Sequence, residues 1–342
     1  MNPPENILII QTAFIGDVIL TTPLIRETKR TFPKSHIDVL VIPQTKELLF
    51  FNPHLRSLLV FDKRGDKRRA FFNILDDIRE HRYDLCLLPH KSMTSALLAY
   101  LGGIPIRIGF RRGSGSALLN RKIDFDKNKR QLERYLDLLI PFSTQKRKAQ
   151  TELFYDDRIR ERAQLLLESL QKCGRVCAVA PGSVWNTKRW PAEYFVRLLR
   201  MFELDDIGFL LLGSRSEYAL CESIAGKVGK ERIINLAGQT SLLEAAAVIQ
   251  KCDLLLCNDS GTMHMANAVQ TDVFAFFGPT VESFGFTPYR AGDVVFQVEL
   301  YCRPCTKHGG HRCPENHFRC MREIQPEQVY QAIVQKCGIH KA

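Results

Sequence analysis

Short apolar runs alternate with helix-like segments along most of the chain, and this alternation constrains the fold more than any other feature. In the first half, the apolar runs that we predict to be strands are Ile7–Gln11, Ile37–Ile42, Leu58–Phe61, Asp84–Leu88 and Ile106–Phe110. The segments with helical spacing between and after them are Asp17–Thr31, Arg68–His81, Met93–Leu101 and Lys129–Ile140. Strands that alternate with helices predict a doubly wound parallel sheet.

The same alternation starts again after a polar, charged segment at 143–157, which has the composition of a linker, and a helix at Asp157–Lys172. The second set of predicted strands is Val176–Ala180, Gly208–Leu212, Ile233–Leu236, Leu254–Cys257, Val273–Phe277 and Val294–Val298. The second set of predicted helices is Pro191–Met201, Ser216–Lys227, Leu242–Gln250, Thr262–Val269 and Pro326–Cys337. We therefore expect two Rossmann-like domains, 1–155 and 156–325, with a last helix in 326–342 that closes the chain. Two such domains that face one another would place a ligand cleft between the carboxyl ends of both sheets.

The excess positive charge of the chain lies entirely in its first half. Residues 1–150 hold 26 Lys and Arg against 15 Asp and Glu, whereas residues 151–342 hold 22 of each. Such a basic half indicates an anionic partner: a phosphorylated lipid, a membrane surface or a nucleic acid. A merely solubilising surface is the alternative, but it does not explain the asymmetry. Met1–Asn6 lacks the basic residue of a signal peptide and no apolar run is long enough to span a bilayer, so we expect a cytoplasmic protein.

The turn after the predicted strand Leu254–Cys257 is rich in groups that bind phosphate. Asp259, Ser260, Gly261, Thr262 and His264 follow the strand directly, and a helix begins among them. A helix N-terminus attracts anions through its unpaired N–H groups and its dipole, and glycine allows a ligand to approach the backbone closely. The alternative is that Asp259 or Ser260 only caps the helix.

Three other turns lie at the same kind of sheet edge. Asp17 follows the first strand and Gly16, where a carboxylate can serve as a general base; the alternative is a plain N-cap aspartate. Ser183, Thr187 and Lys188 precede Pro191 in a turn that suits a diphosphate, or that is a solvated basic loop. Glu217 could accept hydrogen bonds from ribose hydroxyls, or could only complement a helix dipole.

The eleven cysteines do not form the pattern of a small secreted disulfide protein. Their number is odd, and Cys86, Cys177 and Cys257 lie within apolar strand-like runs. Four others have the C-x2-C start of a structural zinc site, although the remaining spacings are short: Cys302, Cys305, Cys313 and Cys320. A reduced cluster that packs a loop and a redox-labile pair are the alternatives to zinc.

Several common nucleotide motifs are missing from the sequence. It contains no G-x-x-x-x-G-K-[ST] loop and no G-x-G-x-x-G after the first strand, which disfavours a nicotinamide dehydrogenase. The D-x-D of metal-dependent sugar transferases occurs once, at Asp124–Asp126 in a Lys-rich stretch, and we interpret it as a chance match.

Taken together, these motifs resemble the ADP-heptose:lipopolysaccharide heptosyltransferases of glycosyltransferase family 9. The resemblance covers most of the chain and is closest to heptosyltransferase II, from the Leu-Thr-Thr-Pro after Gly16-Asp17 and the Cys-rich tail. Its motifs are Ile15–Pro23, Trp185–Pro191, Asn258–Ala266, Phe277–Thr280 and the segment Cys302–Cys320. Their shared order and spacing carry the resemblance, since any one of them alone is weak.

The resemblance implies a GT-B fold and an inverting transfer that needs no cofactor and no catalytic metal. The donor would be ADP-L-glycero-D-manno-heptose, and the acceptor the heptosyl-Kdo2-lipid A inner core of lipopolysaccharide, or Kdo2-lipid A for a heptosyltransferase I. The enzyme would lie peripherally on the inner face of the inner membrane and would not bind nucleic acid. Asp17 would be the base, Lys188 a diphosphate contact and Asp259 a heptose ligand. The remaining donor contacts would be Ser183, Thr187, Ser260, Gly261, Thr262 and His264 near the phosphates and Glu217 near the ribose.

Three other functions compete with this reading. The first is a transferase of the same fold that uses another nucleotide-sugar. The second is a basic nucleic-acid-binding protein, which the sequence disfavours because it carries no RNA-recognition or helix-turn-helix pattern. The third is a non-catalytic relative, although Asp17, Lys188 and Asp259 are all present.

Overall fold

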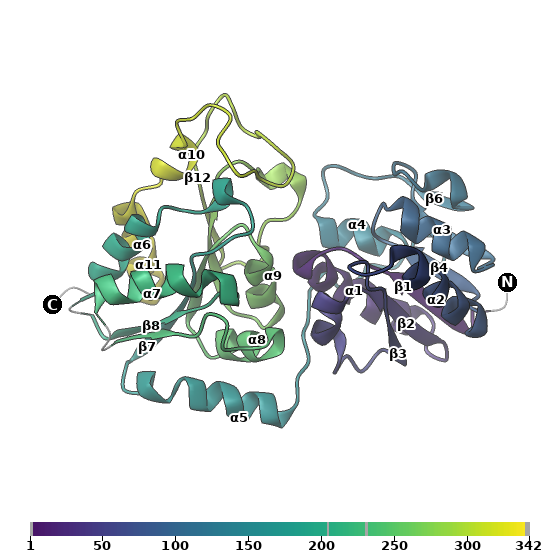
Figure 1. Ribbon diagram of the computed structural model, residues 1–342, viewed down its shortest axis with the longest axis horizontal. Helices are drawn as coiled ribbons and strands as arrows, with labels where there is room; N and C mark the ends of the chain where they lie inside the picture. The colour runs from purple at the N-terminus through teal and green to yellow at the C-terminus, as the bar shows by residue number, and fades with distance from the viewer. Residues whose placement is uncertain (1–2, 204, 230–231, 339–342) are drawn as a thin grey trace. The chain divides into compact units, whose positions relative to one another are not determined.

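The chain forms two compact units, Met1–Phe154 and Tyr155–Ala342, each built around its own parallel sheet (Figure 1). The computed structural model describes residues 3–203, 205–229 and 232–338. The predicted pair of doubly wound α/β domains is therefore confirmed.

The sheet of the first unit has the strand order β3-β2-β1-β4-β5-β6, with its paired strands parallel. Its strands are β1 (Asn6–Ile10), β2 (His36–Val41), β3 (Ser57–Val60), β4 (Leu85–Leu88), β5 (Ile106–Phe110) and β6 (Arg121–Ile123). The order reverses between β1 and β4, and ligands of such sheets bind beyond the carboxyl ends of the strands at this switch point.

Helices cover both faces of this sheet (Figure 1). The α-helices are α1 (Ile15–Thr31), α2 (Lys67–Glu80), α3 (Met93–Leu101) and α4 (Gln131–Asp137), and the 3-10 helices are η1 (Pro43–Leu49) and η2 (Ser116–Leu118). Helix α4 packs on α1, and α3 packs on α2. Asp66 caps α2 by accepting hydrogen bonds from the amides of Arg68 and Arg69, and Ile74, Leu75 and Ile78 form its buried stripe.

The second unit repeats this topology, with the strand order β12-β11-β10-β7-β8-β9. Its strands are β7 (Arg175–Ala180), β8 (Ile207–Leu211), β9 (Ile233–Asn235), β10 (Leu254–Asn258), β11 (Asp272–Phe277) and β12 (Val294–Gln297). The α-helices are α5 (Asp157–Leu166), α6 (Ala192–Arg200), α7 (Tyr218–Val228), α8 (Leu242–Gln250), α9 (Gly261–Ala268), α10 (Arg319–Arg322) and α11 (Pro326–Cys337). The 3-10 helices are η3 (Glu168–Leu170), η4 (Asn186–Lys188), η5 (Arg215–Glu217) and η7 (Glu282–Phe284). The switch point of this sheet lies between β7 and β10.

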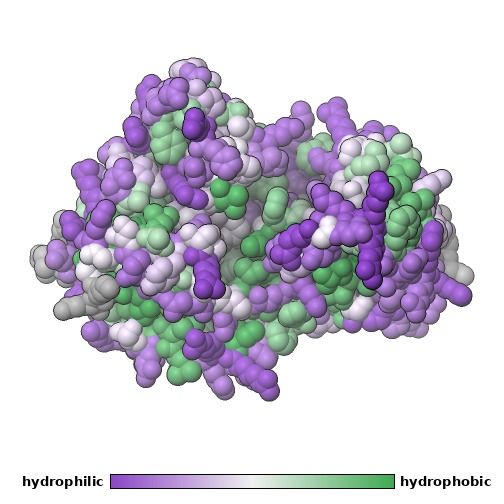
Figure 2. All heavy atoms as spheres, viewed as in Figure 1, coloured by the Kyte–Doolittle hydropathy of each residue, from purple (hydrophilic) through white to green (hydrophobic). Residues whose placement is uncertain are grey.

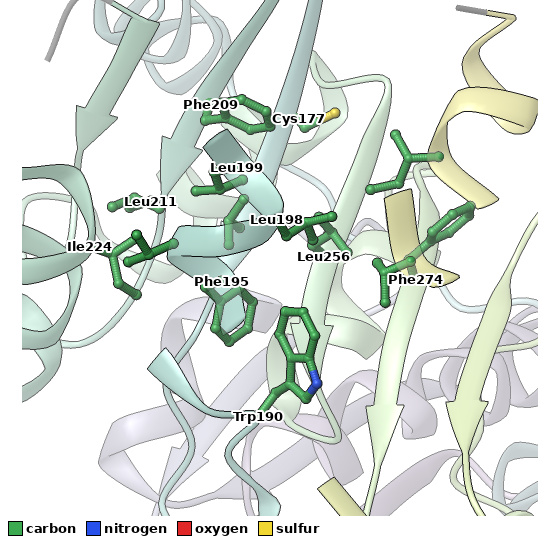
Figure 3. Close-up of a cluster of buried hydrophobic side chains, with 14 of the residues drawn as sticks. Cys177, Trp190, Phe195, Leu198, Leu199, Phe209, Leu211, Ile224, Leu256 and Phe274 are labelled. Carbon is green, nitrogen blue, oxygen red and sulfur yellow. The ribbon is translucent and has the colours of Figure 1, made fainter. Parts of the chain in front are cut away.

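The core of the second unit includes Trp190, which ends the loop after β7 (Figure 3). Its ring is stacked on Phe276 at 4.3 Å between centroids and meets Phe195 edge-on at 4.8 Å. The indole Nε1 donates to the carbonyl of Ile324 at 3.0 Å, so the buried N–H has a partner. Tyr330 of α11 packs on the same core, and the last helix is therefore an integral part of this unit.

The observed elements differ from the predicted ones mainly at their ends. Helix α1 begins at Ile15, two residues before the predicted start, with Phe14 at the N-cap position. Strand β6 was not predicted, because it has three residues and two of them are charged. Charged residues are expected there, since β6 is the edge of its sheet. The predicted helix Asp157–Lys172 is divided into α5 and the short η3. In the part of the chain that is described, no helix is long and apolar enough to cross a membrane.

Candidate functional site

Asp17 lies in the first turn of α1, at the carboxyl edge of the first sheet. The N-cap of α1 is Phe14, so the alternative that Asp17 is a plain N-cap residue is wrong. Its carboxylate oxygen Oδ1 accepts a hydrogen bond from Tyr135 Oη at 3.0 Å. Tyr135 belongs to α4 and is only 2% exposed, so a buried side chain orients the half-buried carboxylate.

The backbone around Asp17 is held by a second set of hydrogen bonds. Thr21 Oγ1 donates to the carbonyl of Asp17 at 2.8 Å, and Gln11 Nε2 donates to Thr21 Oγ1 at 2.8 Å. Burial raises the pKa of Tyr135 well above its usual value, and the neighbouring Asp17 carboxylate raises it further. Tyr135 therefore stays protonated and remains a donor to Asp17 at neutral pH.

His90 is a residue of the same sheet edge that the sequence reasoning missed. It follows β4, the strand that pairs with β1 across the switch point. Burial lowers the pKa of His90, as do Lys63 and Lys91, so its imidazole is neutral at pH 7. Its Nδ1 is among the buried side-chain atoms of the described residues that have no hydrogen-bond partner. The signal in the sequence was a polar residue two positions after the end of a buried strand.

The predicted donor-binding residues follow three adjacent strands of the second sheet. Ser183, Thr187 and Lys188 follow β7, Glu217 follows β8, and the segment from Asp259 to His264 follows β10. These strands are neighbours in the order β10-β7-β8, so their carboxyl ends meet at one edge of the sheet.

Lys188 and Asp259, from two of these turns, form an ion pair. Lys188 Nζ lies 2.6 Å from Asp259 Oδ2, and the side chains are 12% and 10% exposed. Thr280, after β11, donates its hydroxyl to the same oxygen at 2.6 Å. The structure thus pairs Lys188, the predicted diphosphate contact, with Asp259, the predicted heptose ligand. Thr280 was not predicted as a site residue, although it belongs to the Phe277–Thr280 motif.

Helix α9 begins directly beside this ion pair. Its N-cap is Ser260, and within the described chain the Ser260 side chain makes no capping bond but lies 3.3 Å from Thr262 Oγ1. The simple capping role considered for Ser260 is therefore wrong. The first N–H groups of α9, from Gly261 onward, carry the positive end of the helix dipole.

His264 of α9 is buried and uncharged at neutral pH. It is 4% exposed, and its Nδ1 is another buried atom of the described residues without a hydrogen-bond partner. Burial lowers its pKa to about 4; Asp259 opposes this shift and Lys188 adds to it. His264 can thus position a ligand through a neutral ring nitrogen, but it does not add positive charge.

The side chain of Asn258, at the end of β10, forms hydrogen bonds to the loop after β7 at the switch point of the second sheet. This role was not predicted from the sequence. Asn258 Oδ1 accepts from the amide of Trp190 at 2.9 Å. Its Nδ2 donates to the carbonyls of Pro181 at 2.9 Å and Gly182 at 3.1 Å. The side chain is fully buried, so the loop after β7 is positioned by the end of β10.

Two further predicted polar groups, Thr187 and Glu217, also have partners within the protein. Thr187 Oγ1 donates to the carbonyl of Gly310 at 3.0 Å and accepts from its amide at 2.8 Å, which ties the loop to the Cys-rich segment. Glu217 Oε2 accepts from the amide and the hydroxyl of Ser214 at 2.7 and 2.8 Å. Glu217 therefore does complement the start of its helix, which was the alternative reading. Ser183 is 6% exposed.

The Cys-rich segment is held by bonds other than disulfides, since all eleven cysteines are free. Cys305 Sγ donates to the carbonyl of Cys302 at 3.0 Å, and Cys302 Sγ lies 3.8 Å from His317 Nε2. Cys305, Cys313 and Cys320 line one small cavity together with Thr187. Among the described residues, no group of three or more His, Cys, Asp or Glu side chains is arranged to hold a metal ion. Asp124 of the D-x-D pairs with Arg111 at 2.7 Å.

Comparisons with known proteins identify the fold and the family. The family model of glycosyltransferase family 9 (heptosyltransferase) matches residues 71–314. Lipopolysaccharide heptosyltransferase 2 of Salmonella typhimurium is 28% identical over 301 residues, covering 83% of this chain and 85% of that protein. The structure of E. coli ADP-heptose lps heptosyltransferase II is 24% identical, with a TM-score of 0.79 over 97% of this chain and 98% of that chain. E. coli heptosyltransferase WaaC, solved with ADP, is 19% identical, with a TM-score of 0.74 over 97% of this chain and 99% of that chain.

These structural likenesses identify the two sheets as those of a GT-B fold, as predicted. The family model covers well over half of the chain. The chain therefore belongs to glycosyltransferase family 9 (heptosyltransferase), as its motifs indicated, and it is a glycosyltransferase.

Proposed function

We propose that this enzyme transfers heptose from ADP-L-glycero-D-manno-heptose to the inner core of lipopolysaccharide, with heptosyl-Kdo2-lipid A as acceptor. The transfer inverts the anomeric centre and uses no catalytic metal. The observation that carries this proposal is the ion pair of Lys188 with Asp259 beside the start of α9. The names of the relatives, a lipopolysaccharide heptosyltransferase 2 and a heptosyltransferase solved with ADP, support the same donor and acceptor class.

The acceptor side of the reaction is assigned to Asp17. Inverting transfer requires a base that removes the proton of the acceptor hydroxyl as that oxygen attacks the anomeric carbon. The Asp17 carboxylate lies at the carboxyl edge of its sheet, and Tyr135 holds one of its oxygens. The Asp17 carboxylate would receive the proton.

The donor side is assigned to the turns of the second sheet. The departing ADP carries a diphosphate whose negative charge grows as the glycosidic bond breaks. Lys188 and the N–H groups at the start of α9 would stabilise this charge, a task that metal-dependent transferases give to a cation. Asp259 would bind heptose hydroxyls. The remaining contacts would be Ser183, Thr187, Ser260, Gly261, Thr262 and His264 near the phosphates, and Glu217 near the ribose.

The charge of the first half bears on where the enzyme acts, and the cysteines of the second half bear on whether it holds a structural metal. The basic first half is complementary to the phosphates and acidic sugars of a lipid A–Kdo acceptor. The enzyme would therefore act in the cytoplasm, bound peripherally to the inner face of the inner membrane. It would not bind nucleic acid. The reaction needs no cofactor. A structural zinc at Cys302, Cys305, Cys313 and Cys320 rests on their spacing alone, because the described side chains are not arranged around a metal. Metal analysis of the purified protein tests it.

Release of ADP from ADP-heptose, with and without heptosyl-Kdo2-lipid A, tests the proposed function. We expect turnover that depends on the acceptor and that falls at least about 100-fold in Asp17→Asn, as for a lost general base. Asp76→Asn, at an exposed carboxylate of α2, is the control and should behave like the wild type. Turnover only with Kdo2-lipid A would reassign the enzyme as a heptosyltransferase I. Turnover only with another nucleotide-sugar would refute the donor.

A further inference from the structure

The surface of helix α3 is a feature of the first unit that the reaction does not explain. Its sequence, Met93 to Leu101, contains no charged residue. One side, with Ser95, Ala96, Leu98 and Ala99, is buried against the sheet. On the other side Met93 is 48% exposed, Tyr100 51% and Leu101 39%, and Leu97 between them is half-buried. These positions form one stripe at helical spacing, and a contiguous exposed apolar stripe marks an interaction site.

Basic side chains border the beginning of this stripe. The loop after β5 packs on the start of α3, since Ser114 Oγ donates to the carbonyl of Lys91 at 3.2 Å and Gly115 lies against Ala96. This loop carries Arg111 and Arg112, which are exposed, as is Lys91.

Basic side chains also border the end of the stripe. The guanidinium of Arg107 lies 5.3 Å from the ring centre of Tyr100, and Arg79 Nε donates to the carbonyl of Leu101 at 3.3 Å. Arg79 lies near the last turn of the neighbouring helix α2, which also carries Phe72, 59% exposed. The first residues of α2, at the opposite end of that helix from Arg79, are an exposed basic run: Lys67, Arg68 and Arg69. Figure 2 shows hydrophobic surface where Figure 1 places α3, next to hydrophilic surface.

We propose that the α3 surface, defined as Met93, Leu97, Tyr100 and Leu101 with Arg107, Arg111 and Arg112, binds an anionic lipid bilayer. The apolar stripe would enter the boundary between headgroups and acyl chains, and the positive charge of the arginines would attract lipid phosphates. An uncharged stripe within a basic border is complementary to such a membrane. Single-stranded nucleic acid instead binds aromatic platforms in a basic groove, and aliphatic Met93, Leu97 and Leu101 do not provide them.

This inference rests on the proposed function, in which the acceptor is carried by a membrane. It also relates the bilayer to the reaction. Ser95, on the inner side of α3, lies with its Oγ 3.4 Å from Thr12 Oγ1. Thr12 belongs to the turn between β1 and α1 that leads to Asp17. A membrane bound at α3 would therefore lie next to the carboxyl edge of the sheet, where a lipid-anchored sugar must arrive.

Co-sedimentation of the full chain with vesicles tests the α3 surface. The vesicles are made of phosphatidylcholine alone or of phosphatidylcholine with phosphatidylglycerol, and they contain neither donor nor acceptor. We expect binding only to the vesicles with phosphatidylglycerol, weakening as salt is raised. Met93→Ser with Tyr100→Ser should reduce it about tenfold or more. The matched control is Leu165→Ser with Tyr301→Ser, at residues of the second unit that are 62% and 79% exposed, and it should bind like the wild type.

Arg111→Gln with Arg112→Gln gives a second, independent test of the same surface. We expect it to weaken binding to the phosphatidylglycerol vesicles while the unfolding temperature stays that of the wild type. Full binding by both the serine and the glutamine variants would overturn the proposal, as would binding to RNA without any binding to vesicles. Because these vesicles hold no lipopolysaccharide, failure here would leave the proposed transfer reaction standing, and failure of the transfer assay would leave the vesicle result unchanged.

Discussion

Tyr135 of α4 donates a hydrogen bond of 3.0 Å to Asp17 of α1, across 118 residues of sequence. The donor is almost fully buried, whereas the carboxylate is half-buried at the edge of the sheet. The geometry makes Tyr135 a positioning residue for the proposed base.

Replacing Tyr135 by Phe should change the pH dependence of turnover. The hydrogen bond stabilises the charged carboxylate, so its loss should move the acid limb of kcat/KM to higher pH by about one unit. We also expect kcat to fall about tenfold, since Asp17 loses its orientation. The control is Tyr83→Phe, which removes a similar bond of 2.7 Å to Asp38 within the same unit. A pH–rate profile that is the same in Tyr135→Phe and Tyr83→Phe would exclude the positioning role.

Thr280→Val should weaken use of the donor while keeping the shape of the residue. Asp259 would lose the hydroxyl that donates to its Oδ2, and the pair with Lys188 would lose its fixed geometry. A hydrogen bond to a charged group contributes roughly 1.5–3 kcal/mol, so kcat/KM for the donor should fall about tenfold or more. Thr271→Val is matched in burial and removes a bond to the carbonyl of Ile249 away from these residues. Equal kinetics in the two variants would remove Thr280 from the site.

Gly182→Ala should destabilise the protein through Glu217. A Cβ at Gly182 would lie 1.9 Å from Glu217 Oε1, so one of the two must move. Urea denaturation should show a loss of about 1 kcal/mol, because Glu217 would give up its hydrogen bonds to Ser214 when it moves. In a Glu217→Ala background the same change should cost under about 0.5 kcal/mol, since the clash is gone. Gly226→Ala in α7, where a Cβ has open space, should be neutral or stabilising. Equal losses in both backgrounds would contradict the contact.

His264 should make the stability of the protein depend on pH below neutrality. The unfolded chain binds the proton near pH 6.5, but the folded protein binds it only near pH 4. Between these values the unfolded state holds more protons than the folded state. The contribution of His264 to the free energy of unfolding is therefore complete above about pH 6.5 and is lost as the pH drops toward 4. The shift corresponds to roughly 3 kcal/mol. Urea denaturation at a series of pH values should show a flatter dependence for His264→Gln than for the wild type. His36→Gln, at an exposed histidine, should follow the wild type, and a parallel loss in all three proteins would exclude His264 as the cause.

The alternation of apolar runs and helical segments is local information, and it predicted the two doubly wound sheets. Apolar side chains at strand ends and polar residues directly after them repeat along the chain, so the turns that carry Asp17, Lys188 and Asp259 could be found from the sequence. Element ends were less predictable. Phe14 has no capping side chain to mark the start of α1, and the charged edge strand β6 carries no apolar pattern.

The sequence by itself determined the fold class, the family and the residue types that stand at each strand end. Only the tertiary structure decided which of these groups meet. The contacts of Tyr135 with Asp17, Thr280 with Asp259 and Asn258 with the loop after β7 all join segments from different strands and helices. A hydrogen bond needs its two atoms about 3 Å apart, and that depends on the packing of whole helices and the register of a sheet. The sequence pattern predicts on which face of a helix or strand a side chain lies. It does not predict which residue from a distant part of the chain packs against that face.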